Sequence, residues 1–128
     1  MVAFLSQDWL DLHQHLAADL PARPGATLRM QIVVSGGPDG EVVYTQQIED
    51  GRIRAADLGA DAEAAVVLTQ TYADARAIAD GDLELVAGFM QGRVKMTGTT
   101  GDLMAILPLT QSREYQALLA EVAAQTQT

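Results

Sequence analysis

The amino-acid sequence predicts an α+β fold with one twisted, mostly antiparallel sheet of five strands and helices packed mainly on one face. Apolar and polar residues alternate within residues 27–56, which is typical of strands with one buried face. Both ends of the chain repeat apolar residues every three or four positions, as amphipathic helices do. The chain has 128 residues, 48% of them hydrophobic, and no repeat or linker, so we expect a single domain over residues 1–128 with a frayed tail at 125–128.

The first three strands form an antiparallel meander at residues 27–35, 42–48 and 52–56. Asp50-Gly51 joins the second strand to the third, because both residues tolerate the positive φ angles of a two-residue hairpin turn. Residues 64–69 are apolar on both faces, which indicates an internal, covered strand. Residues 93–97 alternate again and form the fifth strand.

Helices are expected at residues 7–20, 72–79, 83–90, 102–107 and 113–124. Three of these helices are preceded by a capping residue, Ser6, Thr71 or Ser112. The side chain of each can accept a hydrogen bond from the first helical turn. The apolar stripe of the first helix consists of Leu5, Trp9, Leu12, Leu16 and Leu20. Pro108 is expected to end the fourth helix, because proline lacks an amide hydrogen and its ring clashes with the preceding turn.

The composition excludes several classes of function. The net charge is −9 and the eight basic residues are scattered, which disfavours nucleic acids and anionic membranes as partners. The absence of cysteine excludes disulfides, thiol catalysis and zinc–thiolate sites. The first residues do not have the pattern of a signal peptide, and no apolar stretch approaches the ~20 residues that span a bilayer. We therefore expect a cytoplasmic protein with no stable membrane insertion.

No set of residues indicates an enzyme, a metal site or a cofactor. His13 and His15 point about 200° apart on a helix and cannot share a metal ion, so we expect both on the surface. The acidic residues fall at turns and helix ends, where nothing would shift their pKa values for acid–base catalysis. The sequence contains no phosphate-binding or nucleophile motif, and residues 98–101 are interpreted as a plain turn.

The helix at residues 102–107 has no polar side chain after Asp102, so it is apolar all round. Such a helix must be buried on more than one side. It either packs in a filled core between the sheet and the last helix, or lines a cavity that a ligand fills. These alternatives stay open, and the five methionines suit both, since methionine fills gaps and also lines adaptable apolar surfaces.

The chain resembles the sterol carrier protein 2 family over nearly its whole length. The most specific match is residues 89–98 (FMQGRVKMTG), with an apolar pair, a glycine, alternating basic and apolar residues, and a second glycine. Residues 69–74 are similar to the family's threonine- or serine-led helix entry, and residues 80–83 to its glycine-led turn, while Thr99 departs from a frequent acidic residue. The resemblance implies a stand-alone bacterial member with a tunnel for an elongated apolar ligand: fatty acid, fatty acyl-CoA, sterol, phospholipid or polyprenyl quinone.

We therefore expect non-catalytic lipid binding, and transfer, in a cavity between the sheet and the C-terminal helices. The expected lining is Phe89, Met96, Leu103, Met104, Leu107, Leu118 and Val122. An alternative is an interaction module whose apolar C-terminal face (Leu118, Leu119 and Val122) binds a second copy or assists a lipid- or quinone-modifying enzyme. A third alternative, a small enzyme using Tyr44, Tyr115 or a buried aspartate, has the least support.

Overall fold

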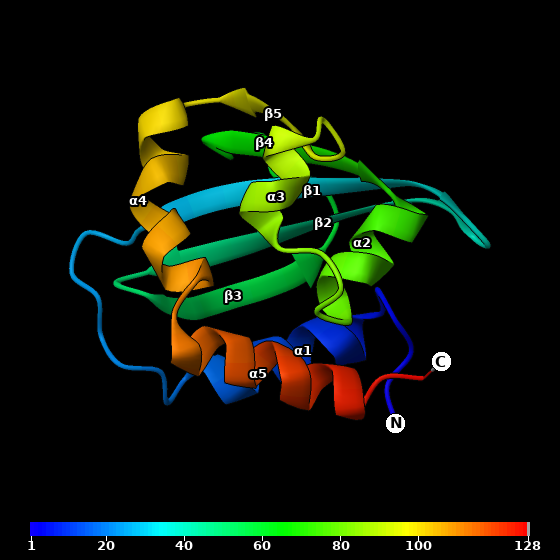
Figure 1. Cartoon of the computed structure of the whole chain (residues 1–128), viewed down its shortest axis with the longest axis horizontal. Coiled ribbons are helices and arrows are strands. Elements are labelled where there is room, and N and C mark those ends of the chain that lie inside the picture. Colours follow the sequence, from blue (N-terminus) through cyan, green and yellow to red (C-terminus); the bar gives the residue numbers. More distant parts are fainter. Residues whose placement is uncertain (128) are drawn as a thin grey trace.

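The computed structural model describes residues 1–127, which form one five-stranded sheet and five helices (Figure 1). In chain order the elements are α1 (Gln7–Ala17), β1 (Leu28–Gly37), β2 (Gly40–Glu49), β3 (Arg52–Leu58), β4 (Val66–Thr71), α2 (Tyr72–Ala79), α3 (Leu85–Met90), β5 (Lys95–Gly98), α4 (Thr100–Thr110) and α5 (Arg113–Ala124). Within these residues, no helix has the length and apolarity needed to cross a bilayer.

The strand order is β3-β2-β1-β4-β5, which places β1 at the centre of the sheet. β1 pairs parallel with β4, and all other neighbouring strands are antiparallel. Ile32 of β1 lies opposite Tyr44 of β2 on one side and Leu68 of β4 on the other. The predicted fold class, a mostly antiparallel five-stranded sheet with helices, is therefore confirmed.

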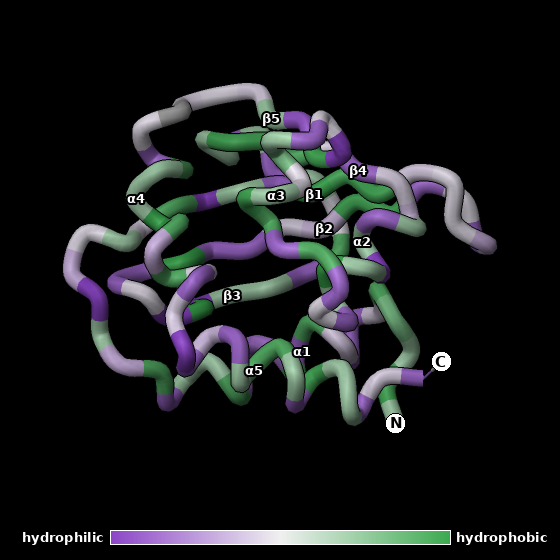
Figure 2. Tube along the Cα trace, viewed as in Figure 1, coloured by the Kyte–Doolittle hydropathy of each residue, from purple (hydrophilic) through white to green (hydrophobic). Residues whose placement is uncertain are grey.

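One face of the sheet is buried beneath the helices. Buried side chains occur at every second position of the central strands, in β1 at Leu28, Met30, Ile32 and Val34, and in β2 at Tyr44, Gln46 and Ile48. In Figure 1, α2, α3 and α4 lie in front of this sheet, and α1 and α5 lie side by side next to β3. Figure 2 shows hydrophobic and hydrophilic residues alternating along α1 and α5, as expected of helices with one buried face.

The two ends of the described chain lie together. The backbone amide of Val2 donates to the carbonyl of Gln125 at 2.8 Å, and the amide of Gln127 donates to the carbonyl of Val2 at 2.8 Å. These bonds tie the segment before α1 to the end of α5, so the two helices that flank the sheet are held at both their packing surface and their ends (Figure 1).

The sequence signals for caps and the tight turn are confirmed. The side-chain oxygens of Ser6, Thr71 and Ser112 accept hydrogen bonds from the amides of Trp9, Asp74 and Tyr115 at 3.1, 3.2 and 3.2 Å. Asp50 and Gly51 have φ angles of 51° and 86°, as a primed two-residue turn requires. Three helices and one hairpin are thus fixed by local chemistry alone.

Three sequence predictions need correction. Pro108 does not end its helix, because it lies on the exposed side of α4, where water can take the place of the missing donor to the carbonyl of Met104. Leu83 precedes α3 instead of belonging to it, and its buried side chain anchors the turn that follows Gly81. β4 is internal, as predicted, but only one of its faces is fully buried, since Val67 is half-exposed.

Candidate functional site

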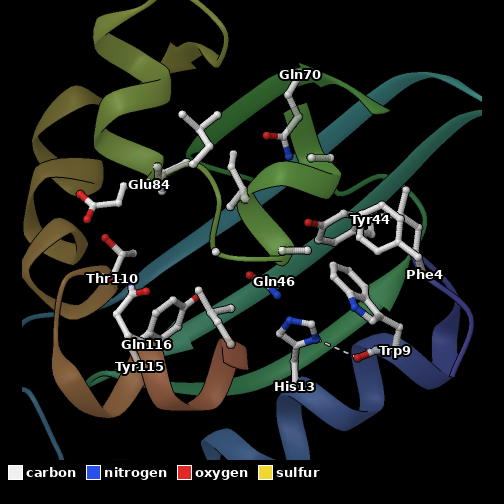
Figure 3. Close-up of a pocket in the computed structure, with 18 residues that line it drawn as sticks. Phe4, Trp9, His13, Tyr44, Gln46, Gln70, Glu84, Thr110, Tyr115 and Gln116 are labelled. Carbon is white, nitrogen blue, oxygen red and sulfur yellow. Dashed lines mark hydrogen bonds between the residues drawn. The ribbon is translucent and has the colours of Figure 1, made fainter. Parts of the chain in front are cut away.

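A cavity of about 110 Å³ lies between the buried face of the sheet and the helices (Figure 3). Its lining comes from the segment before α1 (Phe4 and Leu5), α1 (Trp9 and His13), β2 (Tyr44 and Gln46), β4 (Gln70), α2 (Ala75, Ile78 and Ala79), the α2–α3 turn (Gly81, Leu83 and Glu84), α3 (Leu85), α4 (Thr110) and α5 (Tyr115, Gln116 and Leu119). All five helices contribute, so the cavity is a product of the tertiary fold and belongs to no single motif.

Local periodicity brings the polar lining residues to the cavity. Trp9 and His13 are four residues apart on α1, so their side chains share one helix face. Tyr44 and Gln46 are two residues apart on β2, so both point to the covered face of the sheet. Figure 3 shows these four side chains converging from the helix and the sheet on the same space.

An aromatic cluster gathers at one end of the cavity (Figure 3). The ring of Trp9 makes edge-to-face contacts with Phe4, Tyr44 and His13, with centroid separations of 5.1, 5.8 and 4.3 Å. Such pairs contribute about 0.5–1.5 kcal/mol each beyond the area that they bury. Trp9 is therefore held from three sides, and this end of the cavity has a fixed shape.

His13 is a neutral hydrogen-bonding group in this setting. Its Nδ1 lies 2.8 Å from the backbone carbonyl of Trp9. Because a carbonyl oxygen only accepts, Nδ1 must carry the proton and donate, which leaves Nε2 as an acceptor. Burial lowers the pKa of His13, and the bond to the Trp9 carbonyl only partly offsets this effect, so the neutral imidazole is favoured.

Two buried polar atoms of the lining have no hydrogen-bond partner among the described residues. They are the indole Nε1 of Trp9 and the amide Oε1 of Gln70. Buried polar groups are nearly always paired, because an unpaired one costs about 1–3 kcal/mol. The cavity wall thus holds one unused donor and one unused acceptor.

The two tyrosines of the lining are neutral over the physiological pH range. Burial raises the pKa of Tyr115 to about 12. Burial also raises the pKa of Tyr44, and the neighbouring Tyr115 adds to the shift, since two phenolates would repel each other. Both side chains therefore act as hydroxyl donors and acceptors, not as bases.

The lining contains one charged residue, Glu84, and this residue is exposed at the rim. A second hollow of about 320 Å³ shares Glu84, Leu85, Thr110 and Gln116 with the cavity and extends to Val86 and Gln111. The cavity therefore continues outward between α3 and the junction of α4 with α5. Among residues 1–127, no group of three or more acidic or histidine side chains is placed to hold a metal ion.

None of the seven residues predicted to bind lipid belongs to this lining. Leu103, Leu118 and Val122 are buried in the hydrophobic core, whereas Phe89 and Met96 pack against it and Leu107 is half-buried on α4. Met104 is 58% exposed. Helical phase explains the difference for the three α4 residues, because residues 103–109 have no polar side chain to mark the outer face of the helix. Contact of these seven residues with a lipid stays a prediction from the sequence.

The structure also revises the surfaces assigned from the sequence. The apolar face of α5, expected to bind a partner, is used within the fold, since Leu118 and Val122 are buried and Leu119 lines the cavity. The prediction that His13 lies on the surface is wrong, because this side chain is only 4% exposed, whereas His15 is exposed as predicted.

The sequence contained signals for part of the true lining. The four-residue step from Trp9 to His13 placed the histidine on the apolar stripe of the first helix. Gln46 and Gln70 interrupt otherwise apolar positions of two strands, and a polar residue on a buried strand face is a sign of a polar site. Nothing local indicated that these positions would meet.

Comparisons with known proteins identify a family and a shared fold. A family model described as the SCP-2 sterol transfer family matches residues 10–111. A conserved hypothetical protein from Thermus thermophilus, suggested to be a sterol carrier protein, has a similar structure with a TM-score of 0.73 and 20% sequence identity, covering 95% of this chain and 91% of its own. A crystal structure of sterol carrier protein 2 gives a TM-score of 0.69 at 19% identity, with 94% and 96% of the two chains covered.

The solution structure of palmitated SCP2L2 from Aedes aegypti gives a TM-score of 0.63 at 19% identity, with 80% of this chain and 89% of that chain covered. At these identities the structural likeness shows the fold alone. No curated protein matches the sequence significantly.

Proposed function

The chain belongs to the SCP-2 sterol transfer family, and from that premise we propose that it binds the apolar part of an elongated lipid in the cavity between the sheet and the helices, and passes the lipid on without altering it. The observation that carries the proposal is a cavity between layers, lined by apolar side chains such as Leu5, Ile78 and Leu119. Apolar surface removed from water contributes about 25 cal/mol per Å², which is enough to drive lipid uptake without many directed bonds.

The cavity must widen to admit a lipid. Sites for small organic ligands measure about 300–1,000 Å³, well above the 110 Å³ of this cavity. The adjoining hollow of about 320 Å³ shows where additional room lies, between α3 and the junction of α4 with α5. A lipid chain that occupied both spaces would run from the aromatic end to the rim at Glu84.

The two helices beside that hollow are the least anchored. α1, α2 and α5 each have a side-chain cap at their first turn, whereas α3 and α4 have none. α3 has six residues, and α4 contains Pro108. In Figure 1 both helices lie over the sheet, away from α1. We infer that α3 and α4 move outward when a lipid enters.

The absence of a catalytic role is part of the proposal. The one carboxylate of the lining, Glu84, is exposed at the rim and lies outside the desolvated interior. Tyr44 and Tyr115 stay protonated, and His13 uses Nδ1 to hold the backbone. The Nε2 of His13 is free to accept a hydrogen bond, but burial lowers the pKa of this imidazole, so we assign His13 an orienting role and not that of a base.

The proposal is tested by native mass spectrometry of the purified chain, followed by organic extraction. We expect a 1:1 complex whose extra mass matches an extracted lipid, and saturable 1:1 uptake of an uncharged fluorescent lipid. Met104→Asp tests whether the lipid lies in this cavity or against the seven residues predicted from the sequence. Because Met104 is exposed on α4, uptake should stay within twofold of the wild type. The absence of saturable uptake by the folded chain would end the proposal.

A further inference from the structure

Resting on the proposed function, we propose that this cavity selects uncharged lipids that carry a hydroxyl or carbonyl oxygen, and rejects lipid carboxylates and acyl-CoA thioesters of the same chain length. The class includes long-chain alcohols, ketones and other neutral lipids with one polar end. The preference comes from the polar groups of the interior and from the charge at the rim.

The interior offers hydrogen bonds that the protein itself leaves unused. Trp9 is 5% exposed, and its indole Nε1 has no partner among the described residues. Gln70 has its Oε1 sealed from solvent and likewise unpaired. Both atoms belong to side chains that line the cavity (Figure 3). An entering oxygen that accepts from one group or donates to the other satisfies a buried atom that would otherwise stay unpaired.

A hydroxyl group suits this set better than a carboxylate does. Besides Gln70 Oε1, the interior contains a second acceptor, the unprotonated Nε2 of His13, because Nδ1 donates to the Trp9 carbonyl. A hydroxyl donates to such acceptors and also accepts from donors such as Trp9 Nε1–H. A carboxylate only accepts, so it could pair with Trp9 Nε1–H but would leave Gln70 Oε1 and His13 Nε2 unpaired, with no cation in the lining to offset its charge.

No cation is available inside to neutralise a carboxylate or a phosphate. The lining contains no lysine or arginine. The arginine closest in sequence to the lining residues of α2, Arg76, is bonded to Asp80 at 3.1 Å and to the carbonyl of Gln127 at 3.0 Å. A buried charge without a partner is strongly disfavoured, so an anionic head group would have to remain in solvent.

The rim opposes an anionic head group in solvent as well. Glu84 lies where the cavity meets the outer hollow, and within these two linings it is the sole charged side chain. The whole chain carries a net charge of −9. Repulsion there acts most strongly on the highly charged head group of an acyl-CoA and is absent for an alcohol.

The test is displacement of a fluorescent long-chain alcohol from the 128-residue chain at pH 7.5 by 1-hexadecanol, palmitate or palmitoyl-CoA. We expect hexadecanol to displace the probe at a concentration at least tenfold lower than either anion. Equal or better displacement by palmitate would overturn the selectivity while leaving lipid binding intact. If the probe does not bind at all, the proposed function itself fails.

Two variants test whether the cavity-lining residues Gln70 and Trp9 cause the preference for neutral lipids. Gln70→Leu removes the unpaired acceptor and should weaken hexadecanol binding about fivefold, the loss of one hydrogen bond, with little effect on palmitate. Trp9→Phe keeps an aromatic ring but removes the donor, and should also weaken hexadecanol binding. The matched control is Gln47→Leu, because Gln47 lies on the opposite face of the sheet. An unchanged hexadecanol-to-palmitate ratio in both cavity variants would contradict the assignment.

Discussion

Substituting Ala75 with leucine should weaken lipid binding and raise the free energy of unfolding. Ala75 is a buried residue of α2 whose side chain lines the cavity. A leucine there extends three more carbon atoms into a space of about 110 Å³, so the side chain would occupy volume now open to a ligand. The same substitution at Ala73, which is exposed on the same helix, adds the same atoms outside the cavity.

The size of both effects follows from the cavity. Empty volume costs about 24 cal/mol per Å³, so filling all 110 Å³ would stabilise the lipid-free fold by at most about 2.6 kcal/mol. Leucine fills part of it, and we expect a gain of about 1 kcal/mol. Three lipid methylenes excluded from the cavity lose about 0.8 kcal/mol each, which weakens binding about 50-fold.

Urea unfolding measures the first effect and fluorescent lipid titration the second. Ala75→Leu should raise the unfolding midpoint and weaken binding, whereas Ala73→Leu should leave binding unchanged. If Ala75→Leu binds lipid as tightly as the wild type while remaining folded, the lipid does not occupy this cavity. If Ala75→Leu instead lowers stability by more than about 1 kcal/mol, the space is already filled and the leucine is overpacked.

Two further predictions concern the fold around the site. Because burial lowers the pKa of His13, the unfolded chain takes up a proton near pH 6.5 before the folded chain does, so the free energy of unfolding should fall as the pH drops below that value. Urea titrations measure how far the free energy of unfolding falls between pH 7.5 and pH 5.5. The fall should be smaller for His13→Gln than for the exposed-site control His15→Gln, and equal falls would refute the assignment to His13. Gly98→Ala should cost about 3 kcal/mol, because Gly98 has a φ angle of 113° and a Cβ there would collide with the carbonyl oxygen of Ala65. Gly92→Ala, with a positive φ angle but open surroundings, should cost only about 1 kcal/mol, and similar losses for the two variants would contradict the close approach at Gly98.

The parts of the fold that the sequence predicted are those decided by neighbours in the chain. The caps at Ser6, Thr71 and Ser112 and the turn at Asp50-Gly51 each depend on residues no more than three positions apart. Alternation in β1 identified its buried face, because that face repeats every second residue. The existence of α4 was predicted, but its end and its orientation were not, since residues 103–109 have no polar side chain to mark an outer face and Pro108 faces solvent.

The lining of the cavity could not be predicted in the same way. Gln46, Gln70 and Tyr115 come from three elements that meet only because β4 pairs parallel with β1 and α5 packs beside α1. From the sequence, the cavity was expected between the sheet and the C-terminal helices, lined by apolar residues alone. The structure places it where apolar and polar residues are mixed, because the most apolar residues, such as Ile106, pack closely and leave no space.

A cavity of this kind is unfavourable to the lipid-free fold in two ways. The void costs up to about 2.6 kcal/mol, and the unpaired atoms of Trp9 and Gln70 cost about 1–3 kcal/mol each, against a net stability of about 5–15 kcal/mol for a typical domain. One leucine at Ala75 would fill part of the void, so a more closely packed variant of this chain is within reach of a single substitution. On the proposed function, a bound lipid would fill the void and its polar oxygen would pair with at least one of the two atoms, so both costs would fall. Binding must then stabilise the native state by an amount that grows with the logarithm of free lipid concentration. A neutral lipid should therefore raise the unfolding temperature more than an anionic one at equal concentration, which ties the stability of the fold to the chemistry of its ligand.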